Sequence, residues 1–371
     1  MKTIGLVAGH HCATALEIKA AILAADPSVT VLVDEGEFAE APQGASEAAQ
    51  EAVRKINNFD AVARLQAAGA DVIGFACGCP HRFLKELQTE FTVRLIDPCD
   101  DAGERLTAEA YAARILASDT KRLPKPFKVG MIGGLGPAAT VDLYDKIVKA
   151  TPAKNDQEHF KLVVEQNPQI PDRTKCLLEG GDNPTLAMYN CAKRLEADGC
   201  DCIIVPCNTA HAFVALIEPC VDIPFINMQQ VTMEEIKEKF GDKAVIGLMA
   251  TTGTVRSGLY GDKAQAMGLK MVTPDDEHQK RVMAAIYGPQ GAKAGFTTGV
   301  CHDDLCSAAE YLVKTYDCNV LILGCTELPL ILNEGYATIA GKEVFIIDPT
   351  SALARRVVKV ALDAAKERGV L

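Results

Sequence analysis

Short apolar runs alternate with longer amphipathic segments along the chain. In the middle of the sequence, apolar runs at 128–132, 162–165 and 202–205 have the length of strands, and the segments between them are long enough for helices. Strands that alternate with helices predict βαβ units and a parallel sheet. The runs are almost continuous in Val, Ile and Leu, which indicates that helices cover both faces of the sheet. We therefore predict an α/β fold with flavodoxin-like parallel sheets.

Two local patterns occur three times in the chain. One is a strand-like run that ends in a Gly- or Thr-rich turn, and the other is an apolar strand that ends in a cysteine, at Cys77, Cys207 and Cys325. These cysteines are separated by 130 and 118 residues (207 − 77 and 325 − 207). We therefore predict three copies of one βαβ half-domain, at about 1–124, 125–241 and 242–371, with a proline-containing linker at 123–127 after the first copy.

The composition is that of an ordinary soluble protein. The 371 residues are 48% apolar and 23% charged, and they carry a formal net charge of −11. The negative charge and the aromatic content of only 5% disfavour a nucleic-acid-binding protein. No apolar run approaches the roughly 18 residues of a membrane span, and the N-terminal segment does not resemble a signal peptide. We therefore expect a cytoplasmic protein without nucleic-acid or membrane partners.

Cysteine is abundant, with 14 residues, but no two of them are spaced as C-x-x-C. Without an export signal, we expect free thiols in a reducing compartment, most of them small buried apolar groups. The spacing lacks the usual signature of a zinc site, so we predict no bound metal.

The cysteines at the strand ends are the candidates for chemistry. Ligands bind parallel sheets at the carboxyl ends of the strands, where the next helix N-terminus favours a thiolate or a bound carboxylate. Cys207 is followed by Asn208 and Thr209, and Cys325 by Thr326. If the second and third copies face each other, the two thiols can remove a proton from one face of a carbon and return one to the other face. The alternative is that both are core thiols, but two cysteines at equivalent points of a repeat, each beside polar donors, favour the functional interpretation.

Seven segments of the second and third copies carry a further signal. They are GGLGPAAT at 133–140, NPQIPDRT at 167–174, PCNTAHAF at 206–213, ATTGTVRSGLY at 250–260, AKAG at 292–295, GCTE at 324–327 and IDP at 347–349. In these segments, residues 127–371 resemble the aspartate/glutamate racemase family, and within it the aspartate racemases. The resemblance implies a racemase that uses two cysteines and needs neither pyridoxal phosphate nor another cofactor or metal. It also implies a homodimer, with the site between two similar α/β halves.

The resemblance assigns roles to individual residues. Cys207 and Cys325 match the two acid/base thiols of the family. Arg173 and Lys293 match the cations that bind the side-chain carboxylate of the substrate, a task that suits the planar fork of an arginine. The matches for binding the α-carboxylate are Asn208, Thr209 and Thr326, and those for lining the site in the first turns of the two halves are Gly134 and Thr251. The roles of His211 and Glu327 stay open, because each could support the site or cap a helix.

We predict that the protein interconverts L- and D-aspartate by two-base 1,1-proton transfer between the two cysteines. A glutamate racemase or a broader acidic amino-acid racemase is the first alternative, because one methylene changes little in binding energy. Related decarboxylases and maleate isomerases are disfavoured, since both cysteines and Arg173 are present. The non-enzymatic alternative is an amino-acid sensor derived from a racemase scaffold.

The first copy lacks the features of the other two. It retains Cys77, but Gly78 stands where the other copies have Asn208 or Thr326, and its second strand has no counterpart of Arg173. We interpret it as a non-catalytic half-domain for packing, assembly or regulation. The alternative is that its segment 77–81, Cys-Gly-Cys-Pro-His, binds a metal or acts as a redox switch.

Overall fold

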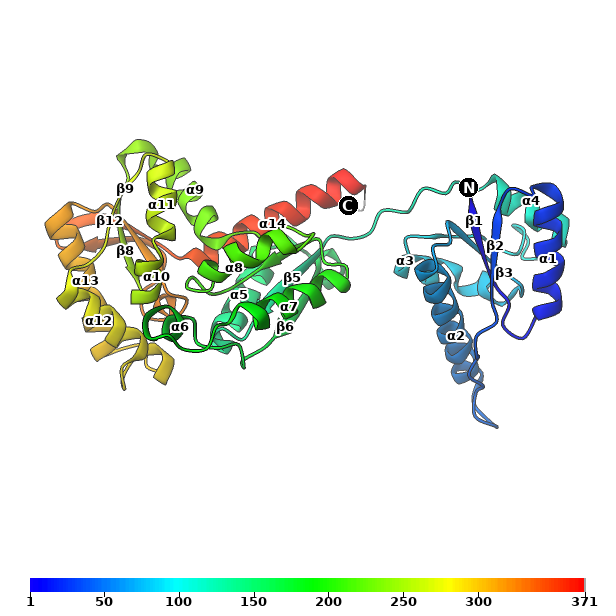
Figure 1. Ribbon diagram of the computed structural model, residues 1–371, viewed down its shortest axis with the longest axis horizontal. Helices are drawn as coiled ribbons and strands as arrows, with labels where there is room; N and C mark the ends of the chain where they lie inside the picture. The colour runs from blue at the N-terminus through cyan, green and yellow to red at the C-terminus, as the bar shows by residue number, and fades with distance from the viewer. Residues whose placement is uncertain (370–371) are drawn as a thin grey trace. The chain divides into compact units, whose positions relative to one another are not determined.

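The computed structural model describes residues 1–369, which form two compact units, Met1–Lys125 and Pro126–Gly369 (Figure 1). The division between the units falls inside the segment that we predicted as a linker. Residues 370 and 371 of the third predicted copy lie outside the described residues. Each unit has its own hydrophobic core and its own parallel strands.

The N-terminal unit is a four-stranded parallel sheet with helices on both faces. Its strand order is β2-β1-β3-β4, with β1 (Thr3–Val7), β2 (Thr30–Asp34), β3 (Val72–Phe75) and β4 (Arg94–Leu95). One face packs against α1 (Cys12–Ala25) and α4 (Ala108–Ala117). The other face packs against α2 (Glu47–Ala67), α3 (Leu84–Glu90) and the short 3-10 helix η1 (Cys79–Phe83).

The first half of the C-terminal unit has a three-stranded parallel sheet in the order β6-β5-β7. Its elements are β5 (Lys128–Gly133), α5 (Pro137–Ala150), β6 (Lys161–Gln166), α6 (Arg173–Glu179), α7 (Thr185–Ala197), β7 (Cys202–Ile204) and α8 (His211–Ile217). The fourth strand that we predicted near 224–227 is reduced to one parallel bridge between Ile203 and Phe225. The pairing stops there because Pro224 has no N–H to donate and Asn227 already caps the next helix.

The second half of this unit has a five-stranded sheet in the order β11-β12-β10-β8-β9, in which only β11 is antiparallel. The strands are β8 (Val245–Ala250), β9 (Lys270–Val272), β10 (Val320–Gly324), β11 (Gly335–Ile339) and β12 (Lys342–Ile347). The helices are α10 (Thr252–Ser257), α11 (Leu259–Ala266), α12 (Asp276–Tyr287) and α13 (Val300–Tyr316). In all three sheets the first strand lies between the second and the third, which confirms the predicted repeated, flavodoxin-like fold.

The last helix of each half packs on the sheet of the other half. From α9 (Met228–Phe240), Met233 and Ile236 enter the core around Ile246 of β8. From α14 (Pro349–Arg368), Leu353 enters the core around Val129 of β5, and Figure 1 shows α14 beside α5. The two halves therefore share their cores and are held in one unit. Within residues 1–369, no helix has the length and apolar content needed to cross a bilayer.

Candidate active site

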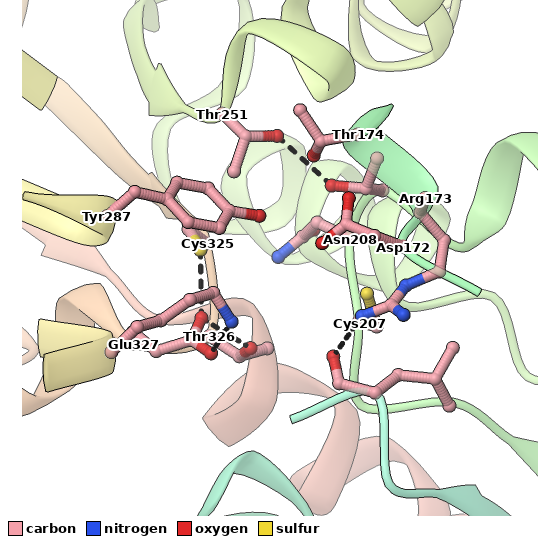
Figure 2. A pocket seen from close by; sticks show the side chains of 13 residues that line it. Asp172, Arg173, Thr174, Cys207, Asn208, Thr251, Tyr287, Cys325, Thr326 and Glu327 are labelled. Carbon is pink, nitrogen blue, oxygen red and sulfur yellow. Dashed lines mark hydrogen bonds and ion pairs between the residues drawn. The ribbon is translucent and has the colours of Figure 1, made fainter. Parts of the chain in front are cut away.

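A polar pocket in the C-terminal unit is lined by the turns that follow β5, β6 and β7 in one half and β8 and β10 in the other (Figure 2). It contains about 310 Å³ of space not filled by atoms, part of which is open to solvent. Eight of the nine residues proposed from the sequence line it, namely Cys207, Cys325, Arg173, Asn208, Thr209, Lys293, Thr326 and Thr251. The lining also includes Leu135, Asp172, Thr174, Tyr287 and Glu327. The structure thus brings side chains of both halves to one small volume.

Cys207 lies in the turn between β7 and α8, and this turn is fixed by His211. Nδ1 of His211 lies 2.9 Å from the carbonyl oxygen of Cys207, and Nε2 accepts a hydrogen bond of 3.2 Å from the backbone N–H of Met228. Nδ1 therefore carries the proton and donates to Cys207. Burial lowers the pKa of His211 to about 4, so the ring is neutral. His211 orients the turn that presents Cys207 and does not itself line the pocket.

Cys325 lies in the turn after β10, where its side chain is buried. Its thiol donates a hydrogen bond of 2.9 Å to Oε2 of Glu327, which also accepts one of 3.2 Å from the hydroxyl of Thr326. Burial and the negative charge of Glu327 raise the pKa of Cys325 well above that of an ordinary cysteine. Cys325 is therefore a thiol at neutral pH.

Lys293 and Glu327 form an ion pair beside Cys325. Burial acts to lower the pKa of Lys293, but the charge of Glu327 outweighs it and raises this pKa to about 12. Burial acts to raise the pKa of Glu327, but Lys293 and the hydrogen bond from Cys325 outweigh it and lower this pKa. Both side chains are therefore charged at neutral pH, and the carboxylate keeps its contact with the thiol.

Arg173 is the first residue of α6, and its guanidinium is held against the wall of the pocket. Nη1 donates to the carbonyl oxygens of Ile170 and Pro171 at 3.2 and 3.0 Å, and Nη2 donates to that of Leu135 at 2.9 Å. The buried Nε has no hydrogen-bond partner among residues 1–369. Burial acts to lower the pKa of Arg173, but the adjacent Cys207 sulfur outweighs it and raises this pKa. The guanidinium thus lies beside Cys207 with one buried donor still available.

Neutral donors from both halves complete the pocket. The hydroxyl of Thr209 lies 3.1 Å from that of Thr251 and 2.9 Å from that of Thr254. Asn208 is oriented by the hydroxyl of Tyr260, which donates a hydrogen bond of 2.7 Å to its Oδ1. The Nδ2 of Asn208 is buried without a partner in the described part of the chain, and Figure 2 shows it pointing into the pocket. It is a second donor that a bound anion can use.

Gly134 is the proposed site residue that does not line the pocket. Its φ is +90°, and a Cβ there would lie 2.6 Å from the carbonyl carbon of Asn167. Gly134 therefore allows the turns after β5 and β6 to approach each other. Gly136 does border the site, because a Cβ there would lie 2.9 Å from Oε1 of Glu327 and 3.9 Å from Nζ of Lys293.

Several residues that line the pocket were not predicted from the sequence. Asp172 and Thr174 flank Arg173, and this adjacency was a usable signal. Tyr287 ends α12, and nothing in its local sequence marks it; it reaches the site because α12 packs beside it. Its ring centre lies 5.4 Å from Nζ of Lys293, and burial raises the pKa of its hydroxyl, so the hydroxyl keeps its proton.

Two thiols and two cations in a polar pocket between α/β halves are typical of an enzyme that acts on a small acidic molecule. The sequence model of the Asp/Glu/Hydantoin racemase family matches residues 132–357. The chain belongs to this family, and it is an isomerase of the amino-acid racemase class. This confirms the resemblance seen in the sequence, and the N-terminal unit lies outside the matched region.

Individual relatives agree with this assignment. The chain is 25% identical over 242 residues to a broad specificity amino-acid racemase of Bacillus subtilis, covering 63% of this chain and 98% of the relative. It is 28% identical over 174 residues to a glutamate racemase of Aquifex pyrophilus, covering 46% of this chain and 63% of the relative. Among solved structures, the aspartate racemase of Picrophilus torridus is 32% identical, with a TM-score of 0.53 and coverage of 63% of this chain and 94% of that chain.

Proposed function

We propose that the protein is a cofactor-independent aspartate racemase with Cys207 and Cys325 as its two acid/base groups. The observation that carries the proposal is that these thiols come from different halves and line one pocket together with Arg173 and Lys293. Inversion at carbon needs a proton acceptor on one face and a proton donor on the other. The two cations suit the side-chain carboxylate of an acidic amino acid. The similarity to the Picrophilus torridus aspartate racemase supports aspartate as that substrate.

In the proposed forward step, the thiolate of Cys207 takes the α-proton. The electron pair of the broken C–H bond moves into the α-carboxylate. The thiol of Cys325 gives its proton to the opposite face, and the electron pair returns to form the new C–H bond. Cys207 ends as a thiol and Cys325 as a thiolate, so the reverse step uses them in opposite roles. The guanidinium of Arg173 lies beside the sulfur of Cys207, and Glu327 accepts a hydrogen bond from the thiol of Cys325, which keeps the proton on that thiol until it is needed.

The charges of the substrate determine how it binds in this proposal. The α-carboxylate gains negative charge during the transfer, so donors aimed at it lower the barrier. Asn208 and Thr209 supply these donors, with the free Nδ2 of Asn208 foremost, and Thr326 joins them when its hydroxyl turns from Glu327 to the substrate. Arg173, through its unpaired Nε, and Lys293 bind the side-chain carboxylate.

A broader acidic amino-acid racemase is the second candidate. The Bacillus subtilis relative has broad specificity and aligns over nearly its whole length. A glutamate side chain is one methylene longer than aspartate, and such a difference changes binding by only about 1–3 kcal/mol.

We also propose a cytoplasmic homodimer. All 14 cysteines are free, as a reducing compartment requires. Val141, Tyr144 and Val148 of α5 form an exposed apolar stripe, with 67%, 46% and 42% of their surface accessible, which a second copy of this chain can cover. Val141→Lys should convert the dimer to a monomer in light scattering, and a wild-type chain that is already monomeric would exclude this assembly.

The test of the enzymatic proposal is α-proton exchange. Each enantiomer of aspartate, and of glutamate in parallel, is incubated with the protein in D₂O without pyridoxal phosphate, and deuterium uptake is followed by NMR. We expect exchange and inversion of aspartate, and a loss of at least roughly 100-fold in Cys207→Ala and Cys325→Ala. Cys220→Ala, which removes an exposed thiol of the same unit, should retain activity. Faster turnover of glutamate would favour the second candidate, and full activity in both cysteine variants of the pocket would exclude the two-thiol mechanism.

A further inference from the structure

A cluster of three different metal-binding side chains lies in the N-terminal unit, outside the racemase pocket. The imidazole of His81, the carboxylate of Asp97 and the thiol of Cys99 each place a donor atom within 4.8 Å of the other two. Nδ1 of His81 lies 2.8 Å from Oδ2 of Asp97. The other oxygen of Asp97 accepts a hydrogen bond of 2.9 Å from the backbone N–H of Cys99. The three side chains are therefore held in place by one another and by the main chain.

The equivalent position in the first half of the C-terminal unit shows what is unusual about His81. His81 follows Cys77 by four residues (81 − 77), as His211 follows Cys207 (211 − 207). His211 is fully buried, and both ring nitrogens bond to the main chain, so it has a purely structural role. A histidine at this position can therefore fulfil its structural role through main-chain contacts alone, without a neighbouring carboxylate or thiol such as those of Asp97 and Cys99.

At the corresponding place in the N-terminal unit, the imidazole is open to solvent and has gained polar neighbours. The side chain of His81 is 36% accessible and that of Asp97 is 31% accessible, whereas Cys99 is buried. The neighbouring cation Arg114 donates to the main-chain oxygens of Asp97 and Cys99 at 3.2 and 2.5 Å. Arg105 donates to the main-chain oxygen of Ala76. Both guanidinium groups therefore bind carbonyl groups beside the cluster.

We propose that His81, Asp97 and Cys99 bind one Zn²⁺ ion, with water in the fourth position. A nitrogen, an oxygen and a sulfur donor together suit Zn²⁺, whereas Mg²⁺ and Ca²⁺ prefer oxygen alone. Tetrahedral zinc keeps such donors roughly 3.3–3.6 Å apart. Binding therefore separates His81 from Asp97 by a fraction of an ångström, draws in Cys99 and releases the thiol proton. The ion would link η1, which carries His81, to the segment between β4 and α4, which carries Asp97 and Cys99. Within residues 1–369, no other cluster of three His, Cys, Asp or Glu side chains has this spacing.

The test uses the full chain, freed of metal by a chelator under reducing conditions and titrated with zinc chloride by calorimetry. We expect one ion per chain at this site. His81→Ala, Asp97→Asn and Cys99→Ser should each weaken this binding by more than about tenfold. In the Co²⁺-loaded protein, the thiolate-to-metal absorption band should disappear with Cys99→Ser.

Two control variants separate this site from other thiols and imidazoles. Cys79→Ser removes an exposed thiol of η1, and His302→Ala breaks a His–Cys pair on α13 in which Nε2 lies 3.7 Å from Sγ of Cys306. Both should retain the bound ion. Absence of zinc binding to the wild-type chain would overturn the proposal, and this measurement does not depend on how the variants fold. The ligand assignment would be overturned if each of the three single variants still bound zinc as tightly as the wild type. It would also be overturned if a control variant lost the ion while Cys99→Ser retained it. Circular dichroism of each variant verifies that it is folded.

Discussion

The thiol of Cys325 donates a hydrogen bond of 2.9 Å to Oε2 of Glu327, so this sulfur faces a negative charge. The sulfur of Cys207 instead lies beside a guanidinium, that of Arg173. A pocket built from two similar halves is therefore electrostatically unequal, with one cysteine paired to an anion and the other to a cation. In the proposed reaction, this difference defines which thiol starts as the acid.

The first prediction concerns the charge of Glu327. Glu327→Gln keeps the size of the side chain and removes the charge that raises the pKa of Cys325. The pKa of Cys325 should fall, so activity that needs the protonated thiol should be lost at lower pH than in the wild type. The pH profiles of kcat/KM for L- and D-aspartate measure this shift, which affects the alkaline limb of the enantiomer that Cys207 deprotonates. Glu343→Gln, an exposed change on β12, should leave the limb in place. A limb that does not move in Glu327→Gln would contradict the role given to this carboxylate.

The second prediction concerns the geometry of Arg173. Arg173→Lys keeps the positive charge but loses the planar fork and the bonds to the carbonyl groups of Ile170 and Leu135. We expect kcat/KM for aspartate to fall roughly ten- to a hundredfold, equivalent to about 1.5–3 kcal/mol for a hydrogen bond to a charged group. Steady-state kinetics tests this, with the exposed Arg256→Lys on α10 as the matched control. Equal kinetics of the two variants would mean that charge alone suffices at this position.

The third prediction concerns the orientation of Asn208. Tyr260→Phe removes the hydroxyl that donates a hydrogen bond of 2.7 Å to Oδ1 of this asparagine, within a buried environment. The free energy of unfolding should fall by about 1–3 kcal/mol. The KM for aspartate should rise because the amide is no longer fixed. Urea unfolding and steady-state kinetics measure the two effects, and Tyr336→Phe, at an exposed tyrosine, should change neither. A stability loss without a rise in KM would separate Asn208 from substrate binding.

The fourth prediction concerns the ionic link between the two halves of the C-terminal unit. Lys146 of α5 pairs with Asp142 and reaches Asp348 at 2.6 Å and Thr350 at 2.8 Å, at the start of α14. Lys146→Met leaves the carboxylate of Asp348, only 2% accessible, without its cation, which should cost about 3 kcal/mol of stability. The same change at Lys149, one turn away and 74% accessible, should cost less than about 1 kcal/mol. Chemical denaturation compares the two, and equal losses would show that the buried link contributes nothing.

The features that could be predicted from the sequence are those that depend on local pattern. The strands are continuous apolar runs, and each cysteine lies at the carboxyl end of a strand, where parallel sheets bind ligands. Two similar half-domains that face each other bring these equivalent strand ends together, so the sequence predicts Cys207 and Cys325 in one pocket. Strand β11, which forms a hairpin with β12, was not predicted although the turn between them has a recognisable form, with positive φ at both Ala340 and Gly341. The usual sequence of this turn is Asn-Gly or Asp-Gly, and here Ala340 stands at the first position, so the sequence did not indicate the turn.

Other features depend on contacts between distant segments and have no local signature. Tyr287 enters the pocket only because of how α12 packs, and the bridge at Phe225 replaces a strand because Pro224 and Asn227 shorten the pairing. Helix α9 buries its apolar face on the sheet of the second half, and α14 buries its apolar face on the sheet of the first half. The amphipathic pattern of each helix predicts that it is buried, but it does not indicate on which sheet. The division of this unit at residue 241 is a prediction from the sequence repeat. The cores that contain α9 and α14 include residues from both sides of this division.

The exchange of these two helices has a consequence for any attempt to cut the protein into pieces. A polypeptide that ended at residue 241 would carry α9 without the sheet it covers, and its own sheet would lack α14. The fragment from residue 242 onward would have the reciprocal deficit. Neither piece can bury its apolar surface alone, but each carries what the other lacks. Produced together, the two should reassociate as a split enzyme, whereas each produced separately should aggregate.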